Sequence, residues 1–146
     1  MSSDGLFSHR LAGLLKRAQV LLVEGYGPAL AGHGIDGREL AVLALLADRG
    51  PTSQQQIGRD LGIDRTTMVA LIDALEGKEL VQRGPDPGDR RKNLVAVTDT
   101  GRSVHRKAGP AIDDVEDRFL APLVEADRQA LKDLLRQLIS AADQRR

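Results

Sequence analysis

Arg65, Thr66 and Thr67 stand together after Asp64, at the start of a segment whose apolar spacing predicts a helix. Arginine can donate two hydrogen bonds to a guanine edge, and threonine can contact a phosphate or a thymine methyl group. The amino terminus of a helix also carries a partial positive charge that favours phosphate. This turn is therefore a candidate for reading DNA bases. The alternative is a solvated first turn that contacts nothing.

A second candidate is the basic tract Asp89, Arg90, Arg91 and Lys92, at the far end of a stretch rich in Gly, Pro and Asp. A narrow minor groove concentrates negative potential and attracts arginine. Because the tract lies between two predicted strands, it predicts a protruding hairpin tip that contacts DNA. The alternative is a flexible charged loop.

The polar residues Ser53, Gln54 and Gln55 begin another predicted helix. Backbone amides and short polar side chains at a helix start can hold a phosphate. Ser53 followed three residues later by Gln56 also matches a capping box, which satisfies the free amides of the first turn. Phosphate binding and plain capping are nearly equal alternatives here, and the two roles can coexist.

The spacing of apolar residues predicts a mainly α chain with one small β-hairpin. Two short strands, 80–83 and 93–97, flank a predicted nine-residue loop, 84–92. A kink or break is expected at Gly109-Pro110 in the long helix that Thr98 caps. The predicted helices cover approximately residues 6–30, 37–49, 54–61, 65–78 and 99–123, and a final one carries apolar residues between 131 and 139.

Two of these helices are joined by only Gly62-Ile63-Asp64, which is the signature of a helix-turn-helix. Glycine fits the left-handed position after a helix end, and aspartate is a preferred helix cap. The second helix is expected to bury one apolar face. The residues assigned to that face are Val69, Leu71, Ile72 and Leu75.

Composition excludes several classes of protein. The chain of 146 residues has no cysteine, so it has neither disulfides nor thiolate metal sites. No stretch of about 20 apolar residues could span a membrane, and a cytoplasmic location is the default expectation. The formal net charge is zero, so DNA binding would depend on local clustering of basic residues.

No motif in the sequence supports an enzyme or a bound cofactor. His9, His33 and His105 are isolated, and no serine stands in a nucleophile motif. The acidic run at residues 113–117 could suggest a metal site, but hydrolytic metal motifs are missing, so a solvated helix face is expected.

The first and last predicted helices both carry long apolar stripes. The segment from Asp36 to Thr98 already forms a small compact unit, so these stripes exceed what it can cover. Pairing with a second copy would bury them, and two-fold dimers are the commonest arrangement. We therefore expect a homodimer. The alternative is that the two helices cover each other within one chain.

The order of segments, together with particular residues, resembles the multiple antibiotic resistance regulator (MarR) family. Asp89, Arg91 and Thr98 match the wing signature of that family, and Val97 stands where leucine is more usual. The resemblance covers nearly the whole chain.

Two further stretches strengthen the resemblance. Residues 57–63 are similar to the third helix and turn of the family, and residues 71–83 to the stretch that leads into the wing. Glu79 stands where that stretch commonly has glycine.

The resemblance implies a triangular dimer with two winged DNA-binding lobes, in which Arg91 enters the minor groove and Asp89 orients it. Such proteins typically repress genes and leave DNA when a small, often phenolic, molecule binds. By resemblance only, the effector pocket would lie near Tyr26, His33 and the helix around residues 40–46. A tyrosine packed at an interface is an equally good interpretation of Tyr26.

These observations predict a single domain of residues 1–146. Residues 1–34 and 99–146 would dimerise, and residues 35–98 would form a winged helix-turn-helix lobe. The predicted function is sequence-specific binding to a palindromic double-stranded DNA operator, with release by a small aromatic ligand. The alternative is a dimeric protein-interaction module that keeps the winged fold.

Overall fold

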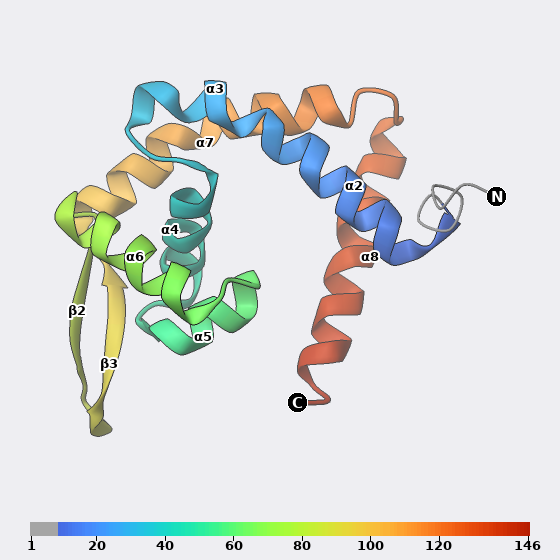
Figure 1. Cartoon of the computed structure of the whole chain (residues 1–146). Coiled ribbons are helices and arrows are strands. Elements are labelled where there is room, and N and C mark those ends of the chain that lie inside the picture. The colour runs from blue at the N-terminus through green and yellow to red at the C-terminus, as the bar shows by residue number, and fades with distance from the viewer. Residues whose placement is uncertain (1–8) are drawn as a thin grey trace.

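The computed structural model describes residues 9–146, apart from the side chain of Lys92. It confirms a mainly α fold with a small antiparallel sheet (Figure 1). The elements are α2 (Leu11–Glu24), α3 (Tyr26–Leu30), a 3-10 turn η1 (Ala31–His33), α4 (Gly37–Arg49), β1 (Thr52–Ser53), α5 (Gln54–Leu61), α6 (Arg65–Gly77), β2 (Val81–Asp86), β3 (Asp89–Val97), α7 (Asp99–Phe119) and α8 (Glu125–Asp143).

The helix caps form where the sequence predicts them. The side chains of Asp36, Ser53, Asp64 and Thr98 each accept a hydrogen bond from a backbone amide in the first turn of the following helix. Gly62 adopts the left-handed conformation, with φ of 66°, between α5 and α6. These local signals fix where each helix begins and therefore set the length of the helix-turn-helix turn.

The core of the molecule lies between α4, α5, α6 and the sheet. Its fully buried side chains include Leu43, Leu46, Ile57, Ile72 and Leu75. An ion pair also joins α6 to α4, because Nζ of Lys78 lies 2.8 Å from a carboxylate oxygen of the buried Glu39.

One predicted core residue is wrong. Val69 is 40% exposed, whereas Met68 is 1% exposed and occupies the buried position. Met68, Leu71, Ile72 and Leu75 follow the three- and four-residue spacing of a single helix face. Val69 comes one residue later than Met68, about 100° around the helix, and therefore faces outward.

The predicted nine-residue loop is also wrong, because β2 continues to Asp86 and β3 begins at Asp89. Only Pro87 and Gly88 remain as the turn. The sheet order is β1-β3-β2, so β2 is an edge strand. An edge strand tolerates Pro85, which lacks an amide donor. The two-residue strand β1, which pairs with β3, was too short to be predicted.

The terminal helices differ from the prediction in detail. Gly25 divides the predicted first helix into α2 and α3, and residues 6–8 of that predicted helix lie outside the described residues. The predicted break at Gly109-Pro110 does not occur, because α7 continues through both residues to Phe119. Pro110 is exposed, so water can satisfy the carbonyl that its ring leaves free.

Neither α2 nor α8 contains a buried residue in the single chain. Figure 1 shows both helices on the side of the molecule away from the β2–β3 hairpin. Their exposed apolar side chains are Leu11, Leu14, Leu15, Val20, Leu21, Val23, Leu131, Leu134, Leu138 and Ile139.

Within residues 9–146, no helix is both long enough and apolar enough to cross a lipid bilayer. The same part of the chain contains no group of three or more His, Asp or Glu side chains that could hold a metal ion.

Candidate nucleic-acid interface

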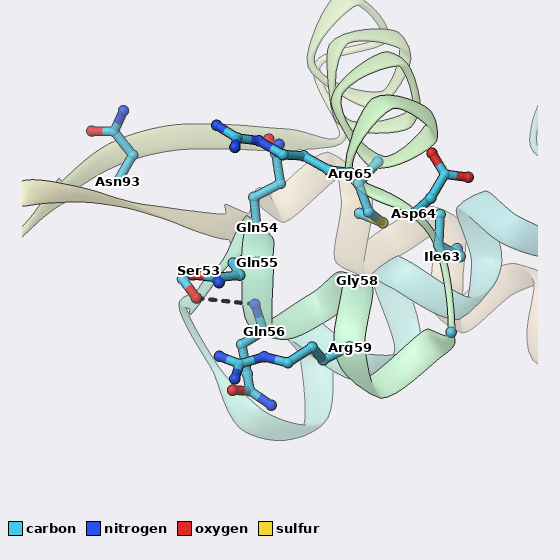
Figure 2. Close-up of a pocket in the computed structure, with 12 residues that line it drawn as sticks. Ser53, Gln54, Gln55, Gln56, Gly58, Arg59, Ile63, Asp64, Arg65 and Asn93 are labelled. Atoms are coloured by element: carbon cyan, nitrogen blue, oxygen red, sulfur yellow. Dashed lines mark hydrogen bonds between the residues drawn. The ribbon is translucent and has the colours of Figure 1, made fainter.

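An open cleft of about 890 Å³ lies between α5, the start of α6 and β3. Figure 2 shows polar side chains from these three elements around it. The cleft brings together two of the three predicted groups, the start of α5 and the start of α6. Its lining residues are Ser53, Gln54, Gln55, Gln56, Gly58, Arg59, Gly62, Ile63, Asp64, Arg65, Met68 and Asn93.

The first turn of α6 presents Arg65 and Thr66 to solvent. Figure 2 shows the side chain of Arg65 extending from the start of α6 toward the side of the cleft that carries Gln54. Thr67 is engaged differently, because its hydroxyl donates to Oδ2 of Asp64 at 2.7 Å and its backbone amide donates to Oδ1 at 2.9 Å. The Arg65 side chain is therefore exposed at the cleft, whereas Thr67 is engaged in the helix cap.

The two hydrogen bonds from Thr67 also affect the titration of Asp64. The backbone amide and then the hydroxyl of Thr67 hold the pKa of the Asp64 carboxyl below its usual value. The cap therefore remains charged at neutral pH and keeps the first turn of α6 in place.

The three polar residues at the start of α5 make different contacts. Oγ of Ser53 accepts from the Gln56 amide at 3.2 Å, so Ser53 caps the helix. Oε1 of Gln54 accepts from the Arg83 guanidinium at 3.4 Å. Gln55 is exposed at the cleft.

The basic tract lies on the wing formed by β2 and β3, at a break in strand register. Pro85 pairs with Asn93, whereas Asp86 pairs with Asp89. Arg90 and Arg91 therefore lie at a shift in register, which forms a bulge near the wing tip. Bulges redirect side chains away from the regular ladder.

Arg90 and Arg91 are both exposed on this bulge. Oδ1 of Asp89 accepts a hydrogen bond from the backbone amide of Arg91 at 3.1 Å. Asp89 thus orders the backbone at the tip, whereas the resemblance had implied a bond to the arginine side chain. The side chain of Lys92 lies outside the described residues.

Gln56, Arg59 and Asn93 also line the cleft, although the sequence did not predict any of them as a site residue. The three-residue spacing of Gln56 and Arg59 could have placed them on one face of α5. Figure 2 shows the Arg59 side chain extending along the cleft toward Gln56. No sequence signal indicated Asn93, because its place at the cleft depends on the register of β3.

A hydrogen-bonded cluster joins α5, which forms one side of the cleft, to the end of α4. Asp60 accepts from Nε2 of Gln56 at 3.0 Å and pairs with Arg49 at the end of α4. Burial alone would raise the pKa of Asp60, but the hydrogen bonds from Gln56 and Arg49 outweigh it and lower the pKa. Asp60 is therefore charged at neutral pH and fixes α5 against α4.

The candidate effector residues lie elsewhere. Tyr26 packs against the core, where burial and then the charge of Glu116 raise the pKa of its hydroxyl. His33 ends the turn η1 and is half-buried. An apolar groove of about 370 Å³ lies beside α3, lined by α2, α3 and α7 residues such as Leu22, Pro28 and Phe119, but neither Tyr26 nor His33 lines it.

Comparison with known proteins identifies the family. Residues 37–92 match the MarR family. The HTH-type transcriptional repressor NicR of Pseudomonas putida is 32% identical over 103 residues, which are 70% of this chain and 65% of the repressor. The chain therefore spans just under two thirds of that relative.

Solved structures cover more of the chain. A repressor named CouR, solved with a 23-mer DNA duplex, is 33% identical with a TM-score of 0.77, and the match covers 95% of this chain and 99% of that CouR chain. BpsR of Bordetella bronchiseptica, whose DNA binding is regulated by 6-hydroxynicotinic acid, is 29% identical with a TM-score of 0.75 over 90% of this chain and 94% of BpsR. The chain belongs to the MarR family and is a winged helix-turn-helix transcriptional regulator that binds DNA.

Proposed function

We propose that this regulator represses transcription by binding a palindromic operator as a homodimer and releases it when a small aromatic acid binds. In this proposal the first turn of α6 enters the major groove and the wing enters the adjacent minor groove. The observation that carries the proposal is the cleft that places Arg65 beside the start of α5 and beside Asn93 of β3, the strand that also carries Arg90 and Arg91. No catalytic role is assigned to the chain.

Each part of the interface has a distinct task. Arg65 and Thr66 contact base edges, with Thr67 holding the cap. Ser53, Gln54 and Gln55 lie along the phosphates beside the groove. Arg91 enters the minor groove, where a narrow groove attracts a guanidinium. Arg90 and Lys92 contribute charge toward the flanking phosphates, and Asp89 holds the backbone of the tip.

The dimer places two such lobes on one duplex. Residues 35–98 form the DNA-binding lobe, and residues 1–34 and 99–146 form the dimer, in which the exposed apolar faces of α2 and α8 are covered. A two-fold dimer reads two half-sites about one helical turn, or roughly 34 Å, apart. The operator is therefore a palindrome.

The effector class is supported by the relatives rather than by a defined cavity in the single chain. BpsR responds to 6-hydroxynicotinic acid. Tyr26, at the start of α3, and His33, at the end of η1, would donate to the hydroxyl or carboxylate of such a molecule once a dimer encloses the site.

A gel-shift with the intergenic DNA upstream of the gene tests the proposal. We expect a discrete band that resists competitor DNA and weakens with salt, by about 0.9 in the logarithmic slope for each neutralised phosphate. Arg91→Ala should bind more weakly and with a shallower slope. Arg136→Gln, on α8, removes the same charge away from the wing and should bind as wild type.

The opposite result has a clear meaning. If no DNA from the upstream region gives a competitor-resistant band, the protein-interaction alternative is favoured. If Arg91→Ala binds an operator normally, the wing is assigned incorrectly.

A second experiment tests release. Adding 6-hydroxynicotinate or salicylate to the protein–operator complex should dissociate the band, and Tyr26→Phe should require more of the same compound. Benzene-1,3-disulfonate, which is anionic but too bulky for a small aromatic-acid site, is the control. Retention of the band with every small aromatic acid would reject the effector part of the proposal.

A further inference from the structure

Arg83 lies where the wing, the recognition helix α6 and the start of α5 meet. It is on β2, and its side chain is 27% exposed. Three different side chains surround its guanidinium. In the sequence, Arg83 stands out only as the last residue of the stretch 71–83 that resembles the family.

The contacts of Arg83 join three elements. Nη2 lies 2.7 Å from Oδ1 of Asp73, and Nη1 lies 3.0 Å from Oε1 of Glu76, both on α6. Nη2 also donates to Oε1 of Gln54 at 3.4 Å. In addition, the backbone amide of Arg83 donates to Oε2 of Glu76 at 3.1 Å, so Glu76 holds both the side chain and the main chain.

An arginine suits this position because its planar guanidinium presents several donors in a fixed arrangement. A single exposed ion pair contributes little, but a network with several partners and a half-buried centre restrains geometry more strongly. Arg83 therefore attaches β2 to the side of α6. Its partners Asp73 and Glu76 lie more than one helical turn after Arg65 and Met68, the α6 residues that line the cleft.

We propose that Arg83 is a positioning residue that sets the distance between the α6 turn and the wing tip, so that Arg65 and Arg91 reach their two grooves together. The inference rests on the proposed function. Arg83 itself need not touch DNA, because two carboxylates already surround its charge. Its effect passes through β2 to the bulge that carries Arg91.

The first test measures geometry without DNA. The chain has no cysteine, so Ala74→Cys on α6 and Arg90→Cys at the wing tip can carry a unique pair of spin labels. Both positions are exposed. Mixing with excess unlabelled protein leaves only pairs within one subunit.

Arg83→Gln should widen the distance distribution between the two labels. Arg136→Gln, which breaks the 2.8 Å ion pair with Asp133 on α8, is the matched control and should leave the distribution unchanged. An unchanged distribution in Arg83→Gln would overturn the inference even in a protein that bound no operator.

The second test is a double-mutant cycle on operator affinity. Arg83→Gln should weaken binding about tenfold, a size that residues coupled in one network commonly give. In the Arg91→Ala background the same substitution should have little effect, because the minor-groove contact that Arg83 aligns has already been lost. Arg83→Lys, which retains the charge but not the planar donors, should recover only part of the affinity.

Equal losses in both backgrounds would overturn the inference, because a general loss of folding or of positive charge does not depend on Arg91. Absence of operator binding by the wild-type protein would instead reject the proposed function. In that case the label distances still decide whether Arg83 positions the wing.

Discussion

The winged lobe and the terminal helices bury their apolar residues in opposite ways. In the lobe, Leu43, Leu46, Ile57 and Ile72 are fully enclosed by neighbouring elements of the same chain. In α2 and α8 no residue is buried, and Leu138 is 58% exposed. The lobe therefore has its own buried core in one chain, whereas we propose that a second copy covers the apolar faces of the terminal helices.

Because of this difference, substitutions in the two regions are expected to change different properties of the protein. The lobe depends on short-range features, such as helix caps and a small enclosed core, so its defects lower the free energy of unfolding. If the terminal helices form the dimer, as we propose, their defects change the oligomeric state and then DNA affinity, because one subunit reaches only one half-site. Four variants test this separation.

The largest effect is expected from Leu134→Glu with Leu138→Glu on α8. Each leucine is more than half exposed in the single chain. Burying it in the dimer therefore stabilises association by about 1 kcal/mol for each leucine of each subunit. Burying a glutamate carboxylate in its place would cost a further several kcal/mol of association free energy. The dimer dissociation constant should rise more than about a thousandfold. Sedimentation should give the monomer mass with a folded lobe.

Gln137→Glu with Ser140→Glu is the matched control, because it adds the same charge to a different face of α8. That variant should remain dimeric. If the leucine variant also stays dimeric, α8 does not form the interface.

Leu75→Ala in the core of the lobe should have the next largest effect. Leu75 is fully buried, so its truncation removes apolar contacts and leaves a cavity. The free energy of unfolding should fall by about 2–5 kcal/mol, measured by urea denaturation. The dimer mass at low temperature should not change. Dissociation of this variant into folded monomers would contradict the separation of the two regions.

Glu79→Gly should stabilise the lobe slightly. Glu79 follows α6 with φ of 60°, a left-handed conformation that costs a side chain about 1 kcal/mol. The Thr98 hydroxyl donates to its carbonyl at 2.7 Å and holds the backbone there. Glycine should raise the free energy of unfolding by about 0.5–1 kcal/mol. Glu79→Ala keeps the strain and should give no such gain, and equal gains would assign the effect to the lost charge.

The smallest effect concerns the exposed cap of α6. Since the pKa of Asp64 is lowered in the folded protein, its stabilising effect is fully present above its unfolded pKa of about 3.9. That effect disappears as pH falls through the lower folded pKa. Asp64→Asn still caps the helix but does not titrate there. Urea midpoints measured from pH 6 to pH 2.5 should therefore fall less steeply in Asp64→Asn, and identical slopes would show that the cap does not contribute.

Local chemistry explains which parts of the fold were predicted. Asp36, Asp64 and Thr98 cap helices through amides only three residues away, so neighbouring residues suffice to identify them. Gly62 identifies the left-handed turn for the same reason. The helix-turn-helix was therefore predictable, including the exposed place of Arg65.

The wrong predictions concern features that depend on residues distant in sequence. Gly, Pro and Asp between 84 and 92 favour a loop, yet pairing with β3 extends β2 to Asp86. Met68 rather than Val69 is buried because the core sets the rotation of α6.

The amino-acid sequence by itself determined the order of the helices, their caps, the helix-turn-helix and the apolar faces that need a partner, because these follow from spacing within a few residues. Only the tertiary structure decided the strand register, whose shift leaves Arg90 and Arg91 outside the regular pairing of β2 with β3. It also decided that Asn93 lines the cleft and that Arg83 contacts α5 and α6. Strand register and a guanidinium shared by three elements depend on contacts between distant segments, and those segments meet only when the whole lobe packs.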